Sequence, residues 1–127
     1  MIYAKRCLLI EDDHDDQLVF SVLLYKLNKS IICTSVDNAD EAMEKLQRDL
    51  PAIPDLIFLD LNLPGVNGID LLIRIKANAA LCIIPVVIYT TSSRSEDIVK
   101  AKKLGAVALI TKSYHIRDLA RKLSAFF

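Results

Sequence analysis

Near the middle of the chain stands the sequence Leu56-Ile57-Phe58-Leu59-Asp60-Leu61-Asn62-Leu63-Pro64. Successive side chains of a strand point to opposite faces of the sheet, and the first four residues here are all apolar. This pattern predicts a strand that is buried under helices on both faces. An acid is tolerated in such a strand only at the carboxyl end, where the strand emerges from the sheet. In α/β proteins that end is where ligands bind, so Asp60 is a candidate reactive group.

Short strand-like segments alternate with longer segments of helical period on either side of this sequence. Strands are predicted at residues 8–10, 31–36, 56–59, 86–89 and 107–110. Helices are predicted at residues 18–27, about 38–48, about 69–77, 93–105 and 116–127, with capping-box spacings at Asn38/Glu41 and Ser93/Glu96. The second strand is the most polar, which places it at a sheet edge. Five β-then-α units predict a doubly wound α/β fold around a five-stranded, mostly parallel sheet.

The composition is that of one globular domain over residues 1–127, with 53% hydrophobic and 25% charged residues. Sixteen basic and sixteen acidic residues give a net charge of +0, which provides no drive toward nucleic acid or a membrane surface. The longest apolar stretch, residues 79–89, is far shorter than the roughly 18 residues that span a bilayer. Cys7, Cys33 and Cys82 are too widely spaced for a disulfide framework or a zinc site and are expected to be small buried side chains. A cytoplasmic location is expected.

The carboxyl ends of parallel strands lie at one edge of the sheet, so the residues that follow the strands should converge there. Those residues are carboxylates, hydroxyls and a lysine: Glu11, Asp12, Asp13, Asp60, Thr90, Thr91, Thr111 and Lys112. Clustered carboxylates repel one another, and a hard divalent cation such as Mg²⁺ relieves that repulsion. A hydroxyl and an ammonium group can hold phosphoryl oxygens. The residues therefore predict a site for Mg²⁺ and a phosphoryl group.

Four segments resemble, in order and spacing, the receiver domain of two-component response regulators. They are residues 9–13, 58–68, 86–90 and 110–112, at the ends of the predicted first, third, fourth and fifth strands. The resemblance covers essentially the whole chain. It implies a flavodoxin-like (βα)5 fold with strand order 2-1-3-4-5. Because the chain ends at Phe127, where the last predicted helix ends, a stand-alone receiver is expected.

The resemblance implies that Asp60 is the phosphoacceptor, a carboxylate nucleophile that takes a phosphoryl group from a kinase phosphohistidine. Thr90 is then the switch hydroxyl and Lys112 the ammonium that contact the phosphoryl oxygens. Spacing from Pro85 favours Thr90 over the neighbouring Thr91. The implied activity is self-phosphorylation from a phosphodonor and autodephosphorylation, without further enzymatic turnover.

The resemblance also implies the ligands of a Mg²⁺ ion. Asp12 is expected to bind it directly and Glu11 through water, with Asp60 and the main-chain carbonyl of Asn62 as further ligands. The acids that come next are expected to stabilise the N-terminus of the first helix instead: Asp13, Asp15 and Asp16. The two histidines, His14 and His115, are expected at the surface or in a first helical turn, outside the site.

Two residues depart from the family pattern. Leu109 stands where many receivers carry an aromatic residue that moves with the switch hydroxyl, and Ser113 follows Lys112 where the family commonly has a cis proline. A cis bond before a non-proline residue costs about 2.5–4 kcal/mol, which leaves the Lys112–Ser113 geometry open. Activation is expected to be a population shift in the Thr90 loop, the fourth helix and the fifth strand. Asn62 and Ser92 are expected to tune the lifetime of the aspartyl phosphate.

The implied partners are a sensor histidine kinase or phosphotransfer protein and a downstream protein. The face made by the fourth helix, fifth strand and fifth helix, where the family commonly docks partners or dimerises, is the expected contact surface. Three alternatives stay open. They are a receiver fragment of a larger response regulator or hybrid kinase, an aspartyl-phosphate phosphatase or transferase, and a phosphorylation-independent binding module. Such enzymes typically carry a second acid where this chain has Asn62.

Overall fold

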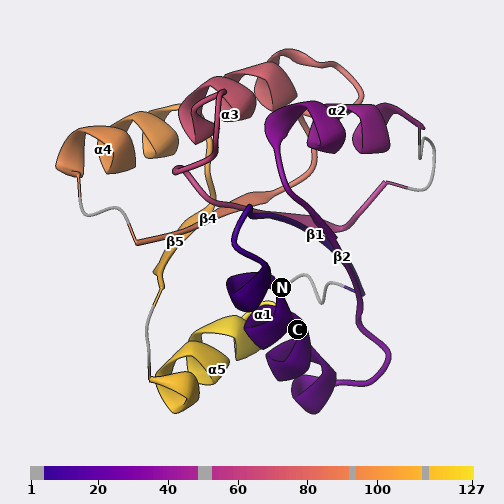
Figure 1. Cartoon of the computed structure of the whole chain (residues 1–127). Helices are drawn as coiled ribbons and strands as arrows, with labels where there is room; N and C mark the ends of the chain where they lie inside the picture. Colours follow the sequence, from indigo (N-terminus) through magenta and orange to yellow (C-terminus); the bar gives the residue numbers. More distant parts are fainter. Residues whose placement is uncertain (1–4, 49–52, 92–93, 113–114) are drawn as a thin grey trace.

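A parallel β-sheet forms the centre of the computed structural model, which describes residues 5–48, 53–91, 94–112 and 115–127 (Figure 1). Its strands are β1 (Arg6–Ile10), β2 (Ile32–Val36), β3 (Leu56–Leu59), β4 (Val86–Thr90) and β5 (Ala108–Thr111). They are ordered β2-β1-β3-β4-β5, and every neighbouring pair is parallel. The predicted fold class and strand order are confirmed. The second strand lies at a sheet edge, as its polarity predicted.

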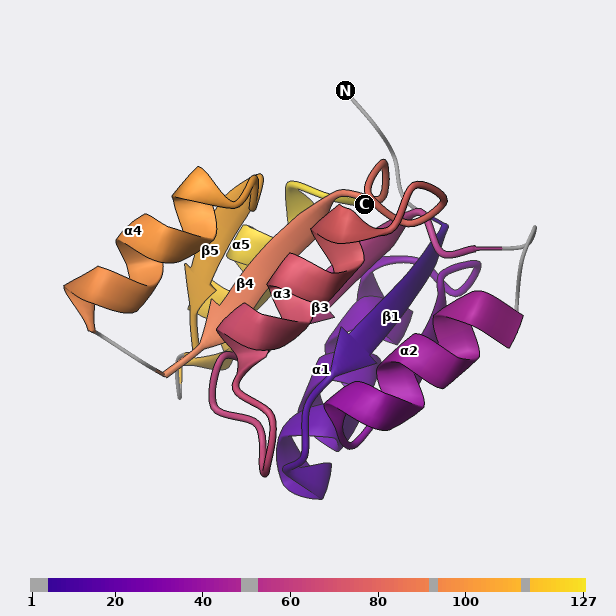
Figure 2. The same cartoon turned by 90° about the horizontal axis from the view of Figure 1, so that it is seen from above.

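Helices cover both faces of the sheet. One face carries α2 (Ala39–Arg48), α3 (Gly68–Ala77) and α4 (Ser95–Lys103), and the other carries α1 (His14–Leu27) and α5 (Ile116–Ser124) (Figures 1 and 2). No helix in the described ranges is long and apolar enough to cross a membrane. Right-handed crossovers explain why both faces are covered. A helix lies on one face or the other according to the side of the preceding strand on which the next strand is added.

The first helix starts four residues earlier than its apolar pattern predicted. Asp13 is its N-cap, and one carboxylate oxygen of Asp13 accepts hydrogen bonds from the backbone N–H groups of Asp15 and Asp16, at 2.9 and 3.1 Å. These acids therefore stabilise the helix N-terminus, as expected. The earlier start brings the first turn of α1 to the carboxyl edge of the sheet.

Capping at the other helices agrees only partly with the predictions. The Asn38 side chain accepts the N–H of Glu41 at 2.9 Å, which confirms the cap of α2. The N-cap of α4 is Arg94, which makes no side-chain capping bond, so the helix starts one residue later than the predicted capping box. Ser93 itself lies outside the described residues. The last helix ends at Ser124, before the predicted Phe127, and the two residues that follow Ala125 fold back onto the core.

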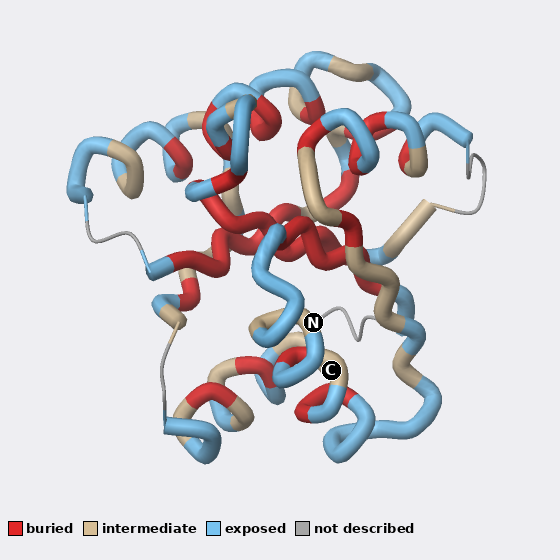
Figure 3. The backbone as a smooth tube through the Cα atoms, viewed as in Figure 1, coloured by how far each residue is buried: buried red, intermediate tan, exposed pale blue. Residues whose placement is uncertain are grey.

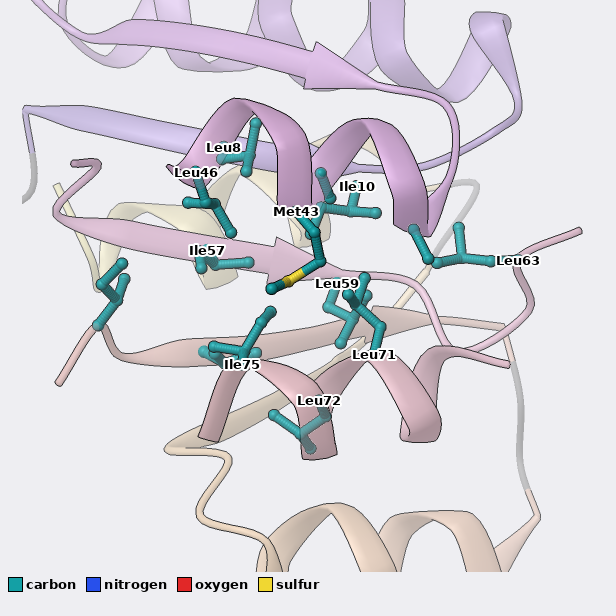
Figure 4. Packing of buried hydrophobic residues seen from close by; sticks show 14 of the residues in the cluster. Leu8, Ile10, Met43, Leu46, Ile57, Leu59, Leu63, Leu71, Leu72 and Ile75 are labelled. Carbon is teal, nitrogen blue, oxygen red and sulfur yellow. The ribbon is translucent and has the colours of Figure 1, made fainter. Parts of the chain in front are cut away.

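The central strand β3 is buried on both faces, as its sequence predicted. Ile57 and Leu59 join a cluster under α2 and α3, where Figure 4 shows them between the side chains of those helices. Phe58 faces the other way and contacts the ring of Phe20, with ring centroids 4.9 Å apart. Figure 3 shows the resulting band of buried residues through the middle of the molecule. All four residues of β3 are apolar and buried, and the first polar side chain, that of Asp60, follows directly at the carboxyl end of the strand.

The three cysteines are free thiols, as their spacing predicted. The expected burial is confirmed for Cys7 and wrong for Cys33 and Cys82, which are only partly buried. Cys7 and Cys33 are paired residues of β1 and β2. A hydrogen bond between these two thiols raises the pKa of Cys7, and burial adds to the effect. The Cys7 thiol is therefore kept protonated and unreactive.

Candidate functional site

Main-chain hydrogen bonds between neighbouring strands hold the site residues at one edge of the sheet. The N–H of Asp60 donates to the carbonyl of Ile10 at 3.1 Å, and the N–H of Lys112 donates to the carbonyl of Thr90 at 2.9 Å. Each bond continues a strand ladder by one residue beyond the strand end. The parallel register therefore brings together side chains that are far apart in the sequence, as predicted.

Asp60 is held by three donors. The hydroxyl of Thr90 and the backbone N–H of Asn62 donate to its Oδ1 atom at 2.9 and 3.0 Å, and the Lys112 ammonium donates to Oδ2 at 3.0 Å. The residue is 3% exposed, so it depends on these donors rather than on water. Both carboxylate oxygens are thus fixed in position, at a site that the solvent barely reaches.

Lys112 binds three carboxylates. Its ammonium contacts Glu11, and it lies 3.0 Å from both Asp16 Oδ2 and Asp60 Oδ2. Burial opposes the charge of the ammonium, but the hydrogen bonds to Glu11, Asp60 and Asp16 outweigh that effect and raise the pKa of Lys112. The group is therefore a permanent cation at neutral pH. The ammonium also lies over the ring of Tyr89, 5.4 Å from the ring centroid.

Asp16 belongs to this site, although the sequence predicted for it only a role at the helix N-terminus. The interaction follows from the true start of α1 at His14, which carries Asp16 over the edge of the sheet toward Lys112. The signal in the sequence is the acidic run after β1, because a helix that starts directly after Asp13 carries Asp16 in its first turn, next to the strand ends. His14 is exposed and pairs with Asp37 at 3.0 Å, in the first turn as predicted.

Glu11, Asp12 and Asp60 form an acidic cluster that fits a divalent cation. Each offers one oxygen, and the three atoms lie within 4.8 Å of one another. Glu11 is buried, and burial raises its pKa to about 7; the Lys112 hydrogen bond opposes this shift and the nearby Asp60 carboxylate adds to it. Oxygen-only donors whose negative charges repel one another suit a hard cation such as Mg²⁺. The part played by the main-chain carbonyl of Asn62 stays a prediction.

Thr90 rather than Thr91 faces the carboxylate. Thr90 is fully buried with its hydroxyl on Asp60, and the amide of Asn62 approaches that hydroxyl at 3.5 Å, whereas Thr91 is exposed. Leu109 is partly buried against the cluster under α2 and α3. Ser92, which is expected to tune the lifetime of the aspartyl phosphate, lies outside the described residues. Ser113, which stands where the family commonly has a cis proline, lies outside them as well.

Gly68 is a further site residue that the sequence did not single out. A Cβ atom at Gly68 would lie 2.5 Å from the carbonyl oxygen of Asp60 and 2.5 Å from the Cα atom of Leu61. Its N–H donates to the Leu61 carbonyl at 3.1 Å. Since no side chain fits there, glycine allows α3 to start directly against the backbone that carries Asp60. Glycine is enriched just after the end of a helix, so a glycine at the first position of a predicted helix is the signal that could have indicated this close approach.

The fold and the residues at the carboxyl edge of the sheet together define a class of protein. It is a five-stranded parallel α/β domain whose strand ends carry a buried carboxylate, a hydroxyl, a lysine and an acidic cluster. The sequence profile of the response regulator receiver domain matches residues 7–124. The chain therefore belongs to the receiver domain family of two-component systems.

Individual relatives agree with this assignment. Response regulator Rcp1 of Synechocystis sp. is 44% identical over 66 residues, which cover 52% of this chain and 45% of Rcp1. The chain spans about half the length of the curated relatives it matches. The crystal structure of the phosphorylated cyanobacterial phytochrome response regulator RcpA is 32% identical with a TM-score of 0.87, covering 95% of this chain and 89% of RcpA. The Mn²⁺-bound form of Rcp1 is 33% identical with a TM-score of 0.79, covering 95% of this chain and 90% of Rcp1.

Proposed function

We propose that this receiver accepts a phosphoryl group on Asp60 from the phosphohistidine of a sensor histidine kinase or phosphotransfer protein, and signals by contact with a downstream protein. The observation that carries the proposal is the Asp60 carboxylate, fixed by the Thr90 hydroxyl and the Lys112 ammonium. An oxygen of Asp60 attacks phosphorus and the phosphorus–nitrogen bond breaks. Its electron pair stays on the histidine ring.

The donors that hold Asp60 are also placed to receive the phosphoryl group. Thr90 and Lys112 reach the two different oxygens of the carboxylate, at 2.9 and 3.0 Å, so they flank any group attached there. In phosphoryl transfer the protein mainly positions the reactants and neutralises charge. We infer that Thr90 and Lys112 exchange their bonds to Asp60 for bonds to phosphoryl oxygens, and that this exchange biases the packing of α4 and β5.

The cofactor that fits best is Mg²⁺, held by Glu11, Asp12 and Asp60. When bound, it neutralises negative charge on the phosphoryl oxygens. Lys112 is the one cation that pairs with Glu11, Asp16 and Asp60 among the described residues, and Asp12 adds a fourth carboxylate beside Glu11 and Asp60, so the site has a formal excess of negative charge. The Mn²⁺-bound form of Rcp1 supports a divalent cation in this family.

The competing enzyme class is less well supported. An aspartyl-phosphate phosphatase or transferase needs an acid or base two residues after its nucleophile, and here Asn62 directs its amide toward Thr90. An amide cannot exchange a proton with a leaving group at neutral pH. We therefore propose self-phosphorylation and autodephosphorylation only.

The proposal is tested by incubating the protein with acetyl phosphate and Mg²⁺ and measuring its intact mass. The wild type is expected to gain one phosphate, and Asp60→Asn none. Asp70→Asn, which changes an exposed aspartate on α3, is the matched control and should gain one phosphate. A chelator should prevent the gain in the wild type. Equal gains in wild type and Asp60→Asn, or no gain in either, would contradict the proposal.

A further inference from the structure

Carboxylates occupy every proton of the Lys112 ammonium. An ammonium group has three protons to donate, and the three partners here are Glu11, Asp16 and Asp60. The side chains of Glu11 and Asp60 are 1% and 5% exposed, whereas that of Asp16 is 40% exposed. Glu11 and Asp60 directly follow strands of the sheet, and Asp16 lies in the first turn of α1. The three partners therefore differ in burial and in the element that carries them.

Two of the three partners change their bonding when the site is used. Asp60 is the proposed phosphoacceptor, so phosphorylation alters its carboxylate directly. Glu11 belongs to the acidic cluster that fits a divalent cation, and a cation there uses the same carboxylate that binds Lys112. The cluster found among the described residues does not include Asp16. The bond from Lys112 to Asp16, at 3.0 Å, is therefore the one that persists through both events.

Empty space beside Lys112 gives this persistent bond a role. A cavity of about 150 Å³ adjoins the lysine, and the other residues that line it are Asp16, Val19, Tyr89, Thr91, Ile116 and Leu119. Neither Glu11 nor Asp60 lines this cavity. An ammonium group that turned into it would therefore move away from the acceptor carboxylate and from any phosphoryl group attached there.

We propose that Asp16 is a positioning residue that holds Lys112 at the edge of the sheet while the bonds of Lys112 to Asp60 and Glu11 are exchanged. The inference rests on the proposed function, because that exchange accompanies phosphorylation of Asp60. With one proton bound to Asp16, the ammonium keeps its other protons directed toward the strand ends, where phosphoryl oxygens arrive. Asp16 acts through Lys112 and does not itself contact the phosphoryl group.

The first test measures the rate of phosphorylation by acetyl phosphate and Mg²⁺, followed by intact mass. Asp16→Ala should slow the reaction roughly tenfold, because a misplaced charge-neutralising group contributes little to phosphoryl transfer. The matched control is Asp15→Ala, which removes the same charge from an exposed neighbour in the same helical turn and should keep the wild-type rate. Asp16→Glu retains the charge and should recover part of the rate. Asp16→Asn should be slower than the wild type, so the comparison does not depend on alanine alone.

The second test asks whether Asp16 acts through Lys112. In a Lys112→Ala background, which has no ammonium to hold, adding Asp16→Ala should leave the residual rate of phosphorylation unchanged. A purely structural effect of Asp16 on α1, or a direct effect of its charge on the donor, would instead slow or speed the reaction in both backgrounds.

The third test needs no phosphorylation. Ammonium protons held by carboxylates exchange slowly with water, so Lys112 should give a ¹⁵N–¹H ammonium signal in NMR spectra, assigned by its absence in Lys112→Ala. With Mg²⁺ present the signal should persist in the wild type and in Asp15→Ala. It should broaden or disappear in Asp16→Ala, where the ammonium has lost its persistent partner.

The outcomes separate this inference from the proposed function. If the wild type gains no phosphate, the proposed function fails, and the NMR comparison still decides whether Asp16 holds Lys112. If the wild type gains phosphate, the inference is overturned by equal rates in the wild type and Asp16→Ala, by a further change in the Lys112→Ala background, or by an ammonium signal that Asp16→Ala leaves unchanged.

Discussion

The buried carboxyl group of Glu11 should make the protein less stable as the pH rises toward neutrality, and Glu11→Gln should remove that dependence. The pKa of Glu11 is raised from its ordinary 4.5 to about 7, chiefly by burial. A raised folded-state pKa means that the folded protein binds the proton more tightly than the unfolded chain. The stability it contributes is therefore complete below about pH 4.5 and is lost as the pH rises to about 7. A change of this size corresponds to roughly 3 kcal/mol.

The measurement is urea unfolding in the presence of a chelator, between pH 4.5 and 8, for the wild type and Glu11→Gln. Glutamine keeps the size of the side chain and an oxygen that accepts from Lys112, so it removes the titration with little change in packing. His14 contributes a second pH dependence, because its bond to Asp37 raises its pKa and the stability from that pair is lost as the pH rises. Since both proteins retain His14, the difference between them isolates Glu11.

The wild type should lose roughly 3 kcal/mol more than Glu11→Gln across this range. Adding Mg²⁺ should flatten the decline in the wild type, because a cation bound at the acidic cluster favours the ionised form of Glu11. If the difference in unfolding free energy between the two proteins is the same at every pH, then Glu11 is not the buried titrating group and the reasoning fails.

Three further substitutions test individual contacts by urea unfolding. Gly68→Ala should cost about 1–3 kcal/mol or more, because its Cβ would press on the backbone of Asp60, and it should slow phosphorylation by acetyl phosphate; unchanged stability would contradict the close approach. Thr90→Val should cost about 1–3 kcal/mol by removing a buried donor to Asp60, while Thr90→Ser should restore most of it. Asp13→Ala should cost about 0.5–2 kcal/mol through the lost cap of α1, with the helix content measured by circular dichroism; Asp16→Ala, which leaves the cap in place, should keep that content.

Most of the fold could be predicted because its signals are local. The apolar run before Asp60 requires burial on both faces, and the alternation of strand and helix patterns allows few topologies besides a parallel sheet. The predicted ends of helices were less accurate where a capping residue, rather than the apolar pattern, sets the helix start. At α1, Asp13 caps the helix upstream of its first apolar residue.

The residues that reach the edge of the sheet could be predicted from the order of the strands, because the carboxyl ends of parallel strands lie on the same side of a sheet. The sequence therefore identified Glu11, Asp60, Thr90 and Lys112 as neighbours. The contacts among these residues, in contrast, could be seen only in the folded protein. The pairing of Asp16 with Lys112 and the raised pKa of Glu11 depend on burial and on distances between segments remote in the chain, and no local pattern of residues encodes those quantities.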